Sequence, residues 1–133
     1  MKRKIKYPSE EDIIEYNLLI LSIIKVKKSD HAEILSYLKI KETIKECKET
    51  KGDIYDKAAI LLKCLIQKHP FASGNRRTAF IVTKAFVLTN KGKFKIKDDP
   101  DYARVMIGIR ERYYSDEEIK EWIKNGKIKK FKR

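Results

Sequence analysis

The apolar residues of this 133-residue chain recur three and four positions apart in most segments, which is the period of an α-helix. The first such segment begins at Ser9 and stays apolar through Val26, and a second begins near Asp30. A third opens at Asp53, with Asp56 in its first turn, and one face of it carries Ile54, Ala58, Leu61, Leu62 and Leu65. The pattern therefore predicts an all-α fold.

The next helix differs from the others in its pattern. Residues 76–90 are apolar on nearly every side, which is typical of a helix inside a domain. Pro70 ends the preceding helix because the residue before a proline resists the helical conformation. Gly92 is expected to stop the helix at its other end. These signals predict a helical bundle around one central buried helix.

The remaining segments read as one short connection and two more helices. Residues 93–97 alternate between lysine and apolar side chains, which fits either an extended piece or one strand of a short hairpin. Asp99 followed by Pro100 predicts a helix start, because proline is favoured in the first turn. Ser115 with Glu118 predicts a capping box on the last helix.

No linker or internal repeat divides the chain, so we expect a single domain over residues 1–133 with frayed ends at about 1–7 and 127–133. With 42% hydrophobic and 38% charged residues, the chain can form a core and stay in water. No apolar run approaches the roughly 20 residues of a membrane span. Acidic residues also interrupt the place where a signal peptide would be apolar. We therefore expect a cytoplasmic protein with no membrane partner.

The formal net charge is +13, and basic residues gather near both ends. Such a charge permits nucleic-acid binding. However, no aromatic side chains are interleaved with the basic ones, as sites for single-stranded nucleic acid require. A composition rich in lysine, glutamate and isoleucine is also typical of heat-adapted proteins. We favour a solvated basic surface over a nucleic-acid site.

The turn before the central helix carries the most suggestive chemistry. His69 lies at its edge, Gly74 lets the backbone approach a phosphate, and Asn75, Arg76 and Arg77 follow at the helix start. A helix N-terminus attracts anions through its free N–H groups and dipole, and arginine adds a fork for phosphate oxygens. Histidine ordinarily titrates near neutrality and can accept a hydroxyl proton. The pattern predicts a phosphate site beside a general base.

This turn resembles the signature of the Fic/Doc (death-on-curing) family, which reads His-x-Phe-x-Asp/Glu-x-Asn-Lys/Gly-Arg. His69, Phe71, Asn75 and Arg77 match it, and Arg76 stands where Doc-type members carry lysine. The resemblance extends weakly over most of the chain. It implies the family's helical bundle around a buried central helix.

Two further positions resemble the Doc branch of the family more than the Fic branch. Thr78 and the alanine after it continue the sequence as in Doc-type members. The longer Fic form has another arginine three residues after Arg77, where this chain has Phe80. Phe71 and Thr78 are expected to be structural parts of the motif. Phe71 would fasten the turn to the core, and Thr78 would pack at the helix start.

The resemblance implies a transferase that modifies a protein target. His69 would deprotonate a hydroxyl of the target, while Gly74, Asn75, Arg76 and Arg77 would hold the phosphates of ATP. Doc-type members transfer the terminal phosphoryl group, for example to a translation factor, and Fic-type members transfer AMP. Doc-type members are toxins that a separate antitoxin neutralises.

Many members of the family are instead silenced by an internal helix with the pattern Ser/Thr-x-x-x-Glu-Gly/Asn. In this chain Ser29 and Glu33 match it only in part, because Ile34 follows. The resemblance therefore implies a separate antitoxin as a partner.

Ser73 stands where the family carries the acidic residue that holds Mg²⁺. A hydroxyl can ligate Mg²⁺, but it is neutral and weaker than a carboxylate. Asp53 and Asp56 are further candidates for a metal ligand. One alternative interpretation is therefore a catalytically weakened module that binds a nucleotide or another anion.

A third interpretation is an RNA-directed helical toxin, such as the HEPN-type ribonucleases. Those enzymes need an arginine a few residues before the histidine on one helix. Residues 63–68 contain none, so we rank this interpretation last.

Overall fold

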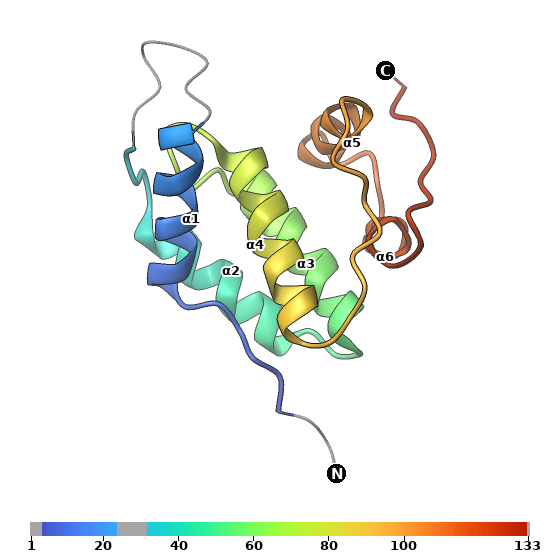
Figure 1. The fold of residues 1–133 in the computed structure, drawn as a ribbon, viewed down its shortest axis with the longest axis horizontal. Helices are drawn as coiled ribbons and strands as arrows, with labels where there is room; N and C mark the ends of the chain where they lie inside the picture. The colour runs from blue at the N-terminus through green and yellow to red at the C-terminus, as the bar shows by residue number, and fades with distance from the viewer. Residues whose placement is uncertain (1–3, 24–31, 133) are drawn as a thin grey trace.

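The computed structural model describes residues 4–23 and 32–132 of the chain. Their regular structure consists of six helices without a strand: α1 (Glu10–Ile23), α2 (Tyr37–Glu49), α3 (Ile54–Gln67), α4 (Asn75–Thr89), α5 (Asp101–Arg110) and α6 (Asp116–Asn125). Figure 1 shows α3 and α4 side by side, with α1 and α2 on one flank and α5 and α6 on the other. The expected all-α fold class is confirmed.

Two helices share the centre of the bundle. α4 packs against α1 and α3, and α3 packs against α2, α4, α5 and α6. The core includes Ala79, Val82 and Val87 of α4. It also includes four residues of α3 that were predicted to lie on one face: Ala58, Leu61, Leu62 and Leu65. Lys84 and Leu88 are exposed, so α4 is buried on most of its circumference but not on all of it. The predicted central helix is thus paired with α3 in the core.

The second helix begins later than its sequence pattern predicted. We expected a start near Asp30, which lies outside the described residues, whereas α2 starts after Ser36, whose hydroxyl accepts the N–H of Lys39 at 3.2 Å. Ile34 instead forms an isolated antiparallel bridge with Phe71. The apolar residues before Ser36 were therefore assigned to the wrong element, because a tertiary contact uses their backbone.

The predicted capping signals of α3 and α6 are confirmed. Asp53 and Asp56 form a capping box at the start of α3, and Ser115 and Glu118 form one at α6. The end of α4 differs from the prediction. Lys91, at a φ of 67°, takes a left-handed conformation one residue before Gly92, the residue that we expected to stop the helix. Gly92 lies instead against Val87 and Ile54, where a Cβ atom would come within 3 Å of both.

The connection between α4 and α5 is neither a hairpin nor a strand in the structure. Residues 93–97 run without regular structure along α6, and the N–H of Lys95 donates to the carbonyl of Ile123 at 2.8 Å. Ile96 is buried in the core. The alternating pattern thus reflects an irregular segment that turns its apolar side chains toward the core and leaves its lysines exposed.

The ends of the chain, where we expected fraying at about 1–7 and 127–133, make packing contacts in the part that the structure describes. The N–H of Lys6 donates to Oδ1 of Asn90 at 2.8 Å, and Tyr7 stacks on Phe86. At the other end Phe131 is buried, and its ring packs against Tyr113. Aromatic burial at both ends anchors these segments. None of the described helices combines the length and hydropathy that crossing a membrane requires.

Candidate functional site

The turn between α3 and α4 is fastened to the segment before α2. The N–H of Leu35 donates to the carbonyl of Pro70 at 2.8 Å, and the N–H of Ala72 donates to the carbonyl of Glu33 at 2.9 Å. Phe71 lies between these contacts with 1% of its surface exposed and belongs to the core. Phe71 therefore lies where a residue that fastens the turn to the core was expected.

Asn75 closes the turn from the inside. Its Oδ1 accepts the N–H of Phe71 at 3.0 Å, and its Nδ2 donates to the carbonyl of Phe71 at 2.8 Å. The side chain is buried, so both of its polar atoms need these partners. We had expected Asn75 to cap the helix or donate its amide to a phosphate. The structure uses the amide to shape the turn.

Asn17 supports the same turn from α1, and sequence reasoning missed it. Its Nδ2 donates to the carbonyl of Ser73 at 2.9 Å and to Oγ1 of Thr78 at 3.1 Å. Asn17 and Thr78 are both buried at the helix start. A signal was present in the sequence, because Asn17 is a polar residue on the otherwise apolar face of α1 that carries Ile13 and Ile20.

Gly74 gives α4 an open N-terminus. It lies in the left-handed region at a φ of 77°, and among residues 4–23 and 32–132 no side chain caps the first turn that follows it. A Cβ atom at this position would lie 3.3 Å from both Nδ2 of Asn17 and Cδ2 of Leu21. Glycine therefore satisfies both the backbone conformation and the close packing. The backbone N–H groups of the first turn remain for an anion.

His69 lies at the edge of the turn and is exposed to solvent. Its backbone is left-handed at a φ of 52°, which is uncommon for a residue with a side chain. Nδ1 of its ring lies 3.1 Å from Nδ2 of Asn75. Because that amide nitrogen can only donate, Nδ1 is the acceptor and the neutral ring carries its proton on Nε2.

The two arginines of the turn have different surroundings. Arg76 is exposed, whereas Nη1 of Arg77 donates to Oδ1 of Asp98 at 3.1 Å and to the hydroxyl of Tyr102. The hydrogen bond to Tyr102 raises the pKa of the Arg77 guanidinium, and the nearby Asp98 carboxylate adds to the effect. The fork expected to bind phosphate is therefore already held on one side by residues of α5 and the segment before it.

A pocket of about 500 Å³ gathers these residues. It is lined by residues of α1, the α3–α4 turn, the start of α4 and α5: Ile20, Leu21, Ile66, His69, Ala72, Ser73, Gly74, Asn75, Arg76, Arg77, Tyr102, Ala103, Met106 and Arg110. The structure thus brings together the predicted site residues from His69 to Arg77. Tyr102 and Arg110 were missed, because nothing in the sequence of α5 indicates that it faces this turn.

The residues of this pocket do not match the usual ligands of Mg²⁺. None of the lining residues is acidic, and the side chain of Ser73 offers only a neutral hydroxyl. Asp53 and Asp56 cap the opposite end of α3, which is about 20 Å long at 1.5 Å per residue. Their candidacy as metal ligands is therefore wrong. Within residues 4–23 and 32–132, no group of three or more metal-ligating side chains gathers.

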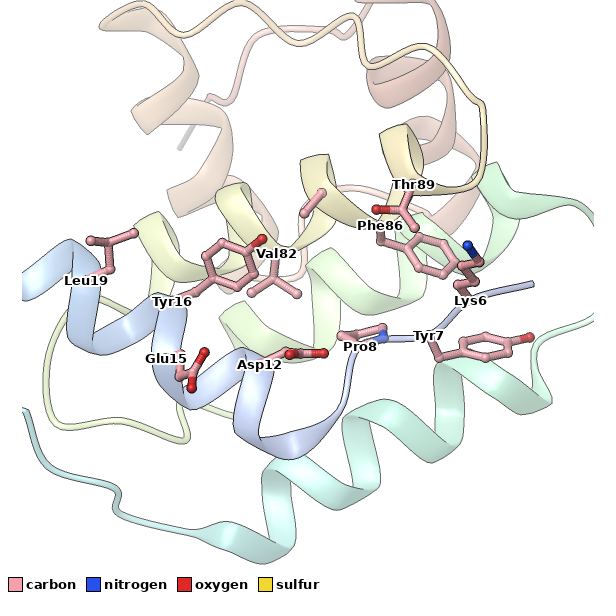
Figure 2. A pocket seen from close by; sticks show the side chains of 11 residues that line it. Lys6, Tyr7, Pro8, Asp12, Glu15, Tyr16, Leu19, Val82, Phe86 and Thr89 are labelled. Atoms are coloured by element: carbon pink, nitrogen blue, oxygen red, sulfur yellow. The ribbon is translucent and has the colours of Figure 1, made fainter. Parts of the chain in front are cut away.

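A second cavity of about 400 Å³ lies on another face of α4 (Figure 2). Its walls come from the segment before α1, from α1 itself and from α4, with Tyr16 and Phe86 on opposite sides. Two acidic residues line it, Asp12 and Glu15, and Oδ2 of Asp12 accepts the N–H of Ser9 at 2.9 Å. None of the signature residues lines this cavity.

The two cysteines take no part in the site. Both are buried, and burial raises the pKa of Cys47 to about 11 and that of Cys64 to about 12. Both thiols therefore stay protonated near neutral pH, which excludes them as nucleophiles.

Comparison with known sequences agrees with the geometry of the turn. No curated protein matches the chain. The profile described as Fic/DOC family matches residues 8–87, which run from just before α1 to the last turns of α4 and include the whole signature turn. More than half of the chain is matched, and so the chain belongs to the Fic/DOC family.

Proposed function

We propose that this protein is a Doc-like transferase that moves a phosphoryl group from ATP to a hydroxyl of a protein target. Membership of the Fic/DOC family supports a Fic-type transferase in general. The observation that carries the proposal is the pocket of about 500 Å³. There an uncapped helix N-terminus, Arg77 and His69 face one space.

The phosphates of ATP would bind at the start of α4. Backbone N–H groups after Gly74 supply hydrogen bonds, and Arg76, Arg77 and Arg110 line the same space with positive charge. Phosphoryl transfer depends mainly on positioning and charge neutralisation, which such a set can provide. Four of the lining side chains are histidine or arginine, so the pocket suits a polyanion.

His69 would act on the hydroxyl of the target. A base at Nε2 needs the ring proton on Nδ1, whereas the contact with Asn75 favours the opposite tautomer. Substrate binding must therefore break this contact or turn the ring before His69 can accept a proton. Because His69 is exposed, its ring has room to do so.

AMP transfer is the alternative outcome of the same site. The Fic form of the signature uses a further arginine at the position of Phe80. Here Phe80 is 1% exposed and packs edge-on against Phe94 and Tyr102. This position supplies no charge to the pocket, which favours the Doc-like direction of transfer.

A nucleotide- or anion-binding module without catalysis is the second candidate function. Ser73 replaces the family's acidic residue, and the pocket has no carboxylate among its lining residues to hold Mg²⁺. If the metal is required for transfer, this chain retains binding and loses chemistry. Ser73→Asp tests this directly, because a carboxylate restores a hard ligand for Mg²⁺.

RNA-directed activity has less support from the structure. Two lysines near His69 already form ion pairs. Lys63 of α3 pairs with Asp116 at 2.7 Å, and Lys68, the C-cap of α3, pairs with Glu46 at 3.1 Å. We further propose a cytoplasmic toxin whose target is a protein such as a translation factor and whose partner is a separate antitoxin. These proposals rest on the family resemblance.

The test is incubation of the purified protein with a cell extract and ATP labelled at either the α or the γ phosphate, with and without Mg²⁺. We expect the γ label to move to a protein and His69→Ala to abolish the transfer. The control Lys84→Ala, at an exposed position of α4 outside the pocket, should leave the transfer intact. Calorimetry should show that His69→Ala still binds ATP, because a general base acts on the hydroxyl and not on the nucleotide.

Each other outcome has a defined meaning. Transfer of the α label establishes AMP transfer instead. Transfer by Ser73→Asp alone shows that the metal ligand is what the wild type lacks. If neither the wild type nor Ser73→Asp transfers a label, catalysis is excluded and only the binding module remains.

A further inference from the structure

The guanidinium of Arg77 is fixed by groups outside the signature turn. Nη1 carries two hydrogens, and it donates to Oδ1 of Asp98 at 3.1 Å and to the hydroxyl of Tyr102. The guanidinium carbon also lies 5.7 Å from the centre of the Tyr102 ring. With Nη1 occupied, the edge formed by Nε and Nη2 is the part of the fork left for two phosphate oxygens.

Tyr102 is itself held firmly against α4. Its ring packs edge-on against Phe80, with ring centres 4.8 Å apart and planes at 72°. Phe80 is 1% exposed and lies one helical turn after Arg77. The hydroxyl of Tyr102 is thus placed by the same helix that carries the arginine. An anchored arginine loses less freedom when it binds an anion than a long side chain that moves freely in solvent.

Tyr102 and Arg77 both line the pocket that contains His69. Tyr102 lies on α5, outside the residues 8–87 that match the family profile. We propose that Tyr102 is a positioning residue: its hydroxyl holds the guanidinium of Arg77 so that the free edge of the fork receives a phosphate group. This inference rests on the proposed function, because it assumes that Arg77 binds the phosphates of a nucleotide.

The test is calorimetry with two probes, ATP and inorganic tripolyphosphate. Tyr102→Phe removes the hydroxyl and keeps the ring on Phe80, so thermal unfolding should change little. We expect binding of both probes to weaken about three- to tenfold, the range for loss of one hydrogen bond. Tyr55→Phe is the matched control, because its hydroxyl accepts the N–H of Lys93 at 2.8 Å at the far end of α3. It should bind both probes as the wild type does.

The coupling between the two residues separates positioning from a general structural effect. In an Arg77→Ala background, Tyr102→Phe should change the affinity by less than about twofold, because its action passes through the arginine. If Tyr102→Phe binds like the wild type, or weakens binding equally in both backgrounds, the positioning role is refuted while the proposed function stands. If the wild type binds neither probe, both are overturned.

Discussion

At the scale of single residues, the turn between α3 and α4 is held by buried amides. Asn75 bonds both backbone groups of Phe71, and Asn17 bonds the carbonyl of Ser73. Removing one partner of a buried hydrogen bond leaves the other unsatisfied at a cost of about 1–3 kcal/mol. These asparagines therefore fix the shape of the turn before any ligand arrives.

The tautomer of His69 gives a prediction that needs no substrate. In the free protein, nitrogen NMR of the neutral ring should show the proton on Nε2, because Nδ1 accepts from Asn75. Asn75→Asp keeps an oxygen to accept the N–H of Phe71, and it replaces the amide NH₂ that faces Nδ1 of His69 by a second oxygen, which can only accept. The proton of the neutral ring should then move to Nδ1. A proton on Nδ1 in the wild type would contradict the orientation of Asn75.

The two arginines should differ in their contribution to ATP binding. Arg77→Ala should weaken binding by about 1–3 kcal/mol, the loss expected for a charge-assisted hydrogen bond. Arg76→Ala should have a smaller effect, because Arg76 is exposed and no side chain in the described part of the chain orients it as Asp98 and Tyr102 orient Arg77. Calorimetry on the two variants decides the point, and equal losses would show that only the summed charge matters.

At the scale of the elements, helix starts set by local capping residues were predicted better than one that depends on a tertiary contact. The start of α3 at Asp53 and the capping box of α6 were predicted correctly, because N-cap and N3 residues act within one turn. The start of α2 was misplaced because Ile34 pairs with Phe71, a residue far along the chain. Periodicity could not distinguish an apolar residue in a helix from one in an isolated bridge.

The capping box of α6 makes stability depend on pH. The hydrogen bond from the N–H of Ser115 lowers the pKa of Glu118, so the folded state favours the ionised form. Its contribution is therefore present above the ordinary glutamate pKa of about 4.3 and is lost as the pH falls through the folded value. Glu118→Gln should flatten this part of the stability profile, measured by urea unfolding between about pH 2 and 7. Glu117→Gln, in the same turn, is the control and should leave the profile unchanged.

At the scale of the whole molecule, residues beyond the family profile complete the core. α5, α6 and the segment after them lie outside residues 8–87, yet α3 packs against both helices. Gly108 of α5 meets the rings of Tyr114 and Phe131 so closely that a Cβ atom would lie 2.5 Å from the first. This layer also supplies Tyr102 and Arg110 to the pocket. The C-terminal part is thus needed for both core and site.

Phe131 tests whether the final segment belongs to the folded domain. Phe131→Ala should lower the free energy of unfolding by about 3 kcal/mol, the lower end for removal of a buried phenylalanine. Its exposed neighbour Lys132 provides the control, and Lys132→Ala should change stability by less than about 0.5 kcal/mol. Urea unfolding of both variants measures the difference. If Phe131→Ala and Lys132→Ala have equal free energies of unfolding, the final segment is frayed, as its basic composition suggested.

The sequence by itself determined the helical class, most helix boundaries and the signature turn from His69 to Arg77. Those features depend on periodicity, capping and spacing, which act over a few residues. Only the tertiary structure decided which distant groups meet the turn. Asn17, Asp98 and Tyr102 contact it from 21 to 56 positions away in the sequence, and no local pattern encodes such pairings. The tertiary structure also excludes Asp53 and Asp56 as metal ligands of this site, because the whole length of α3 separates them from it.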